Sequence, residues 1–370
     1  MLPDGNNWQR RHGLNSLLLL AWPVLFNLFG GASAQANLVI KATFDSTITS
    51  DPNAAVIEST INSVIALYEA SFSDPITVTI TFHETTGALG YSSTYYIPGF
   101  LYSTFRASLA AGATTANDTS ALAHLPAGSS NPVNGSATIE LNLPNGRALG
   151  FTESYWNPPG TNPDGDIYLM TSAMNLTRAS INPSKFDLFA VTAHEIDEVL
   201  GLSSKLDGLA NGAPAPTGDV GVMDLFRYNQ NGNRSFNTTS SSQAWFSLDG
   251  TTQLVRFNQT APGDFHDWYS PGGQTPRVQD ASAMPGATPN PTVELIALDV
   301  IGYHPVPALA IARAGNGSET ISWSPNPPGF VLQESTNLVS ANWLNSASGT
   351  NNPATITNTT RIKFFRLFHP

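Results

Sequence analysis

The stretch FDLFAVTAHEIDEVLGL, residues 186–202, decides the fold. Its apolar residues recur at helical spacing and would form one stripe along a helix. These residues are Phe189, Ala193, Ile196 and Leu200. Pro183 lies in the first turn of this pattern and Gly201 follows its last residue, which are favoured positions for proline and glycine. The sequence therefore predicts a helix from about Pro183 to Leu200.

The same helix carries a group of side chains suited to metal chemistry. His194 and Glu198 are four residues apart, so they lie one above the other and would hold a single ion. Glu195 points about 100° round the helix, where its carboxylate would take a proton from water at the metal. Zinc suits this pattern because it lowers the pKa of bound water to about 7. The alternative interpretation is a solvated helix face with a hydrogen-bonded histidine.

Residues 186–202 resemble the active-site helix of the metzincin zinc peptidases, with Gly201 at the matching glycine. Residues 281–303, ASAMPGATPNPTVELIALDVIGY, are similar to the end of a matrixin-like domain, in which Met284 would be the methionine beneath the metal. The alternative for Met284 is ordinary packing in the core. Several short motifs together resemble secreted bacterial metalloproteases: HEI-x-EVLG, DLFRY, WFSLDG, GDFHDW and ALDVIGY. The resemblance implies a zincin-like fold, a zinc ion and peptide-bond hydrolysis, with Glu195 as the general base.

Two positions depart from the metzincin pattern. Glu198 replaces the second histidine, and Ser204 stands in place of the third. A third ligand must then come from elsewhere, and the candidates are His266, Asp224, Asp264 and Asp267. We rank His266 first, because it would complete a site of two histidines and one carboxylate. The alternatives are a surface-loop histidine for His266 and a buried ion pair with Arg227 for Asp224.

Calcium is the alternative to zinc. Two carboxylate-containing turns, NPDGDIY at residues 162–168 and GDFHDW at residues 263–268, offer the oxygen ligands that calcium prefers. Neither turn has the spacing of an EF-hand. The chain has no cysteine, which excludes thiolate zinc modules and thiol nucleophiles. Any metal site therefore uses histidines and carboxylates.

The sequence predicts three parts. Residues 1–34 have the basic start, apolar run and small-residue end of a signal peptide cleaved near Ala34. Residues 35–304 begin with a strand, a helix and a strand, and predict an α+β, zincin-like domain with a mixed sheet. Residues 305–370 follow a change of composition at a Pro-rich stretch. Their short strands predict a small β-sandwich, and they resemble a C-terminal module of secreted bacterial proteins.

Composition narrows the function further. With 16 Lys+Arg against 27 Asp+Glu and a pI near 4.9, the chain lacks the positive charge that nucleic acid requires. The serine-hydrolase elbow and the glycine-rich nucleotide motifs are absent from the sequence. We therefore expect a secreted zinc endopeptidase acting on proteins or peptides, with no membrane span after signal cleavage. The alternative is a non-catalytic extracellular binding protein on a degenerate peptidase scaffold.

Overall fold

The computed structural model describes residues 37–151, 163–210, 220–261, 263–315, 318–327, 329–338, 342–357 and 362–368. The predicted signal peptide, residues 1–34, lies outside these ranges. Among the described residues, no helix combines the length and the apolar character needed to cross a membrane. The chain is a mixed α+β protein, which agrees with the coarse fold class predicted from the sequence.

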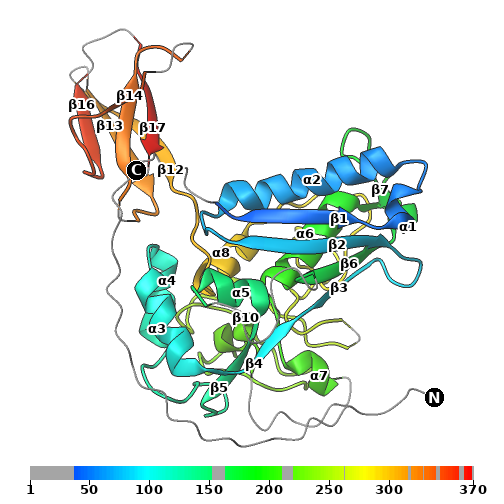
Figure 1. Cartoon of the computed structure of the whole chain (residues 1–370). Coiled ribbons are helices and arrows are strands. Elements are labelled where there is room, and N and C mark those ends of the chain that lie inside the picture. The colour runs from blue at the N-terminus through cyan, green and yellow to red at the C-terminus, as the bar shows by residue number, and fades with distance from the viewer. Residues whose placement is uncertain are drawn as a thin grey trace, which may run out of the picture. The chain divides into compact units, whose positions relative to one another are not determined.

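A four-stranded sheet in the order β1-β2-β6-β3 organises the larger part of the chain (Figure 1). Strands β1 (Val39–Phe44), β2 (Thr77–Glu84) and β6 (Gly165–Leu169) are parallel. Strand β3 (Gly90–Thr94) pairs with β6 in the antiparallel direction and ends the sheet. In β2 the buried residues alternate with more accessible ones, because successive side chains of a strand point to opposite faces.

Two helices pack against each other in the core, α2 (Ala54–Ser71) and α6 (Leu188–Leu200). The Tyr68 hydroxyl of α2 donates a hydrogen bond to the Ala193 carbonyl of α6 over 3.0 Å. Helix α6 begins later than the sequence predicted. The side chain of Asp187 caps it by accepting from the Ala190 amide, so the segment from Pro183 precedes the helix instead of forming its first turn.

The end of α6 agrees with the prediction. Gly201 is its C-cap, with a φ of 144° that favours glycine. The Gly201 and Leu202 amides both donate to the Asp197 carbonyl, which satisfies carbonyl groups at the end of the helix.

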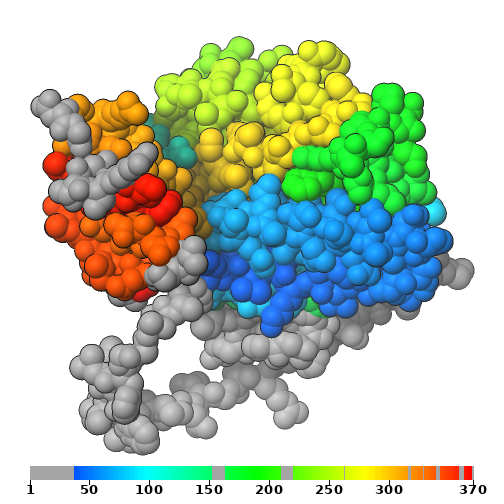
Figure 2. All heavy atoms as spheres, turned by 90° about the horizontal axis from the view of Figure 1, so that it is seen from above, coloured from blue at the N-terminus to red at the C-terminus, as the bar shows by residue number. Residues whose placement is uncertain are grey.

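Shorter elements surround the sheet. Before α6 they are α1 (Ser46–Thr49), β4 (Tyr96–Leu101), α3 (Tyr102–Gly112), α4 (Ala116–His124), β5 (Thr138–Asn142), α5 (Leu143–Ala148), η1 (Thr171–Ala173), β7 (Met174–Asn175) and β8 (Phe186–Asp187). After it come α7 (Leu206–Ala210), η2 (Val222–Phe226), β9 (Arg227–Tyr228), β10 (Trp245–Phe246), β11 (Val255–Arg256) and α8 (Val293–Val300). Figure 2 shows early residues of this body (blue) lying directly against late ones (yellow). One hydrophobic core extends from Leu38 to Tyr303.

The last residues have a separate hydrophobic core. Strands β12 (Ala308–Gly315), β13 (Ser318–Ser324) and β16 (Ala354–Thr357) form one antiparallel sheet. Strands β14 (Val331–Ser335), β15 (Leu344–Asn345) and β17 (Phe364–Phe368) form another. Both sheets contribute to a small cluster of buried side chains that includes Ile321, Trp323 and Leu332. The domain boundary near residue 304 and the sandwich architecture stay predictions.

Candidate metal centre

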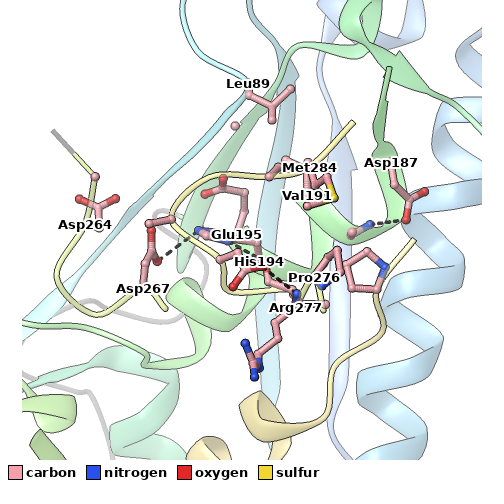
Figure 3. A pocket seen from close by; sticks show the side chains of 18 of the residues that line it. Leu89, Asp187, Val191, His194, Glu195, Asp264, Asp267, Pro276, Arg277 and Met284 are labelled. Carbon is pink, nitrogen blue, oxygen red and sulfur yellow. Dashed lines mark hydrogen bonds and ion pairs between the residues drawn. The ribbon is translucent and has the colours of Figure 1, made fainter. Parts of the chain in front are cut away.

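A cavity of about 220 Å³ opens beside α6 (Figure 3). Strand β3 borders it through Gly90, Tyr91 and Ser92, and α6 contributes His194 and neighbouring residues. The remaining wall comes from residues 263–289, which are far from α6 in the sequence. The cavity therefore brings the predicted metal helix, an edge strand and the GDFHDW loop together.

The predicted pair on α6 faces this cavity. Nε2 of His194 lies 3.3 Å from Oε1 of Glu198. The other ring nitrogen of His194, Nδ1, lies 3.0 Å from the Val278 carbonyl oxygen and donates its proton there. In the neutral ring this hydrogen bond fixes the tautomer, so that Nε2 offers the lone pair that a metal needs. Ser92 donates to Oε2 of Glu198 over 2.7 Å and holds that carboxylate in place.

Asp267 joins the pair from the opposite wall. Its Oδ1 lies 3.4 Å from Nε2 of His194, as the dashed line in Figure 3 shows. Gln279 donates to the same oxygen over 2.9 Å. The sequence named Asp267 among the possible third ligands but ranked it below His266 and Asp224. In the structure it is buried and directly opposite His194.

His266, the first-ranked candidate, also reaches the site. Its Nε2 lies 2.9 Å from Oε1 of Glu198 and 3.7 Å from Oδ1 of Asp267. Its Nδ1 lies 2.9 Å from Oδ2 of Asp207. A carboxylate behind a histidine is the usual second-shell partner of a metal ligand, because it fixes the tautomer and raises the basicity of the ring.

These side chains form two overlapping groups of possible ligands. Within each group, one ligand atom per residue lies within 4.8 Å of the others. The first group is His194, Glu198 and Asp267, and the second is Glu198, Asp264 and His266. Two ligand atoms on one tetrahedral zinc lie about 3.3 Å apart, given metal–ligand distances of about 2.0–2.1 Å. The two separations from Nε2 of His194, 3.3 Å to Glu198 and 3.4 Å to Asp267, are close to this value, so the residues fit a zinc ion.

The charges of the cluster also favour a cation. Burial lowers the pKa of His194, but the charge of Asp267 and the hydrogen bond to Glu198 outweigh it and raise that pKa well above its usual value. Burial raises the pKa of Asp267 to about 7. Without a metal, protons therefore carry the positive charge among these carboxylates. A divalent cation would displace them, as metal binding to histidine and carboxylate ligands generally does.

Glu195 lies next to these ligands without belonging to either group. It is buried, and its Oε2 has no hydrogen-bond partner among the described residues. Burial and the charge of Glu198 raise its pKa well above the usual value. A Cβ at Gly90 would come within 2.4 Å of Oε1 of Glu195, so the edge strand approaches this carboxylate closely. Glu195 is therefore a candidate for proton transfer, because buried carboxyl groups with raised pKa values are typical of acid–base sites.

Asp224 belongs to neither group of possible ligands. Its carboxylate accepts from the Ser204 hydroxyl over 2.6 Å, the Lys205 amide over 3.0 Å and the Gly221 amide over 2.8 Å. It therefore fixes the loop that follows α6. The serine at the expected third-histidine position holds this carboxylate, which explains its role without a metal.

The remaining predicted residues have varied positions. Met284 is 40% exposed and lines the cavity, so it does not fill the core. In the first candidate calcium turn, Asp164 accepts from the Thr79 amide and Asp166 pairs with His83, while Asn162 lies outside the described residues. The acids of the second turn, Asp264 and Asp267, belong to the metal centre.

Sequence reasoning missed three partners of the ligands: Ser92, Asp207 and the Val278 carbonyl. Each lies far from α6 in the sequence or carries no recognisable motif. Only the fold brings them to the ligands.

No family model, curated protein or solved structure matches the chain significantly.

Proposed function

We propose that the protein is a secreted zinc endopeptidase with a zincin-like fold. The observation that carries the proposal is the convergence of His194, Glu198 and Asp267 on one point, with Glu195 beside them in a cavity bordered by an edge strand. Secretion rests on the signal-peptide pattern of residues 1–34. The C-terminal residues 305–370 have no part in the proposed chemistry.

In this proposal His194, Glu198 and Asp267 hold the zinc ion. A bound zinc ion polarises a carbonyl group and makes water more acidic. Ser92 and the Val278 carbonyl keep Glu198 and His194 oriented. Three protein ligands leave a position open, which is typical of catalytic zinc and not of structural zinc.

Glu195 moves the proton. Its carboxylate accepts a proton from the attacking water and then donates it to the leaving nitrogen of the peptide bond. A raised pKa suits both steps, because the group must hold a proton between them. Burial excludes bulk water from this carboxylate and strengthens its interaction with charges that develop nearby.

The substrate would bind along β3. Among the described residues this strand pairs only with β6, so its other edge offers free backbone groups. An extended peptide would add to that edge, with main-chain hydrogen bonds giving affinity. Because Gly90 and Tyr91 also line the cavity, a peptide on this edge would pass the metal centre.

The experiment that tests this function is Glu195→Gln. We expect peptide hydrolysis to fall about 100-fold or more, the range for a lost general base, while zinc content stays unchanged. The assay would measure cleavage of a mixed peptide library together with zinc per chain. Hydrolysis that survives the substitution would remove Glu195 from the mechanism, and absence of zinc from the wild type would remove the mechanism itself.

One observation favours a second candidate, the non-catalytic binding protein. The ligand side chains pair with one another without an ion, through His266 with Glu198 at 2.9 Å and His194 with Asp267 at 3.4 Å. Such a network would stabilise a scaffold that had lost its metal. Zinc-free wild-type protein with full thermal stability and no hydrolytic activity would support this candidate.

A further inference from the structure

We propose that the centre binds two divalent cations, bridged by Glu198. This inference rests on the proposed function and deepens it, because it assigns the second ligand group that a single catalytic zinc leaves unused. The two groups share Glu198 and otherwise consist of one histidine and one aspartate each.

The arrangement around Glu198 is nearly symmetric. Its Oε1 lies 3.3 Å from Nε2 of His194 and 2.9 Å from Nε2 of His266. Both rings present Nε2 to Glu198, because each Nδ1 is held by a separate acceptor, the Val278 carbonyl or Asp207. Two imidazoles prepared in this way next to one carboxylate oxygen would supply the donor set of a bridged pair of ions.

The coordination number gives a second reason. If His266 joined His194, Glu198 and Asp267 on one zinc, four protein ligands would surround the ion. Four ligands close a tetrahedral site and leave no position for chemistry. Assigning His266 to a second ion, together with Asp264, keeps the first ion open. Asp267 lies 3.7 Å from Nε2 of His266 and so links the two halves.

Charge balance is the third reason. Six carboxylates line the cavity. Asp187 pairs with Arg178, and Asp280 accepts from the Arg277 amide and lies near the charge of that arginine. The other four lie beside the two histidines: Glu195, Glu198, Asp264 and Asp267. Metal-binding histidines are neutral, so the ionised centre carries four negative charges from these groups. One divalent cation leaves half of that charge uncompensated in a partly buried site, which is costly. Two divalent cations balance it.

The test is zinc stoichiometry in chelator-treated protein that is equilibrated with excess free Zn²⁺ and then separated from unbound metal. We expect two zinc ions per chain in the wild type. Asp264→Asn and Asp267→Asn, which each remove a ligand unique to one group, should each retain one. Asp280→Asn is the matched control, because Asp280 lines the same cavity but belongs to neither group, and it should retain two.

A second measurement shows whether the ions are neighbours. Loading the protein with two Co²⁺ ions per chain should give a magnetically coupled pair, with an electron paramagnetic resonance signal much weaker than that of two isolated ions. Asp264→Asn should restore the signal of one isolated ion. Asp264 is exposed, so this variant should fold, and its circular dichroism spectrum checks that it does.

The outcomes separate the two proposals. One zinc per chain in the wild type, or two uncoupled Co²⁺ ions, would overturn the bridged pair and leave the zinc peptidase standing. Two ions retained in Asp264→Asn would also overturn it. No zinc in the wild type would overturn both.

Discussion

Asp207 holds His266 from behind, with 2.9 Å between Oδ2 of Asp207 and Nδ1 of His266. The same aspartate accepts a hydrogen bond from the Phe265 amide, so it positions both the ring and the backbone of the loop. This pair links α7 to the GDFHDW loop and places Nε2 of His266 against Glu198. The position of His266 beside Glu198 therefore depends on a residue outside both groups of possible ligands.

Asp207→Ala should weaken zinc binding at the His266 position by about 10–100-fold, the usual effect of losing a second-shell carboxylate. Competition with a fluorescent zinc chelator would measure the affinity. Asp166→Ala is the control, because it removes a carboxylate from a different histidine, His83, outside the cavity. Unchanged zinc affinity in Asp207→Ala would show that His266 is not a ligand.

Gly90→Ala should displace the Glu195 carboxylate. A Cβ at this position would lie 2.4 Å from Oε1 of Glu195 and 2.7 Å from Cγ1 of Val191, so the strand or the helix must shift. We expect a loss of about 1–3 kcal/mol of stability from overpacking and a lower kcat with zinc retained. Urea unfolding and peptide hydrolysis would measure the two effects.

Gly87→Ala provides the comparison for Gly90→Ala, because the nearest atom to its added Cβ is Oγ1 of Thr85 at 3.7 Å, an ordinary contact. It should be nearly neutral in both assays. If Gly90→Ala behaves in the same way, the close approach of β3 to Glu195 has no functional consequence.

Asp224→Ala should destabilise the fold without removing zinc. The substitution leaves the Gly221 and Lys205 amides and the Ser204 hydroxyl without their acceptor in a buried loop. Unsatisfied buried donors cost about 1–3 kcal/mol each, so we expect a loss of about 3 kcal/mol after partial rehydration. Chemical unfolding and metal analysis would check it, and loss of zinc from a folded variant would return Asp224 to the ligand set.

The parts of the site that could be predicted are those whose residues lie close together in the sequence. His194, Glu195 and Glu198 lie on one helix, whose period fixes their relative directions. The apolar patterns of β1, β2 and α2 were equally readable, because each buries one face.

The rest depended on tertiary structure. Asp224 and Asp267 are both acids that follow α6 in the sequence. Only the fold shows that Asp267 lies beside His194, while Asp224 accepts a hydrogen bond from the Gly221 amide. The start of α6 was misjudged for a local reason. Pro183 and Asp187 are both good residues for a helix start, and the carboxylate of Asp187 caps the helix at the later position.

A final prediction concerns pH and a cluster on the central sheet. His83 of β2 lies between two carboxylates, with 2.8 Å from Nδ1 to Asp45 and 2.9 Å from Nε2 to Asp166. Its ring also stacks on Tyr168. Burial lowers the pKa of His83, but the hydrogen bonds to Asp166 and Asp45 outweigh it and raise that pKa above the usual value.

The sign of the effect follows from linkage. The folded protein binds the His83 proton more tightly than the unfolded chain does, so protonated His83 stabilises the fold. This stabilisation is complete below about pH 6.5, the pKa of an unperturbed histidine. It disappears as the pH rises through the raised pKa. At the acid end, hydrogen bonds from Thr47 and His83 outweigh the effect of burial and lower the pKa of Asp45, so its contribution is lost as the pH falls through that lowered pKa.

His83→Gln should therefore lose more stability at pH 5.5 than at pH 8.5, as measured by urea unfolding at both values. His124→Gln is the control, because the ring of His124 bonds to the Ser120 carbonyl and pairs with no carboxylate among the described residues. The loss of stability in His124→Gln should not be larger at pH 5.5 than at pH 8.5. Equal losses for His83→Gln at both pH values would show that the ring acts through packing alone, with no contribution from its charge.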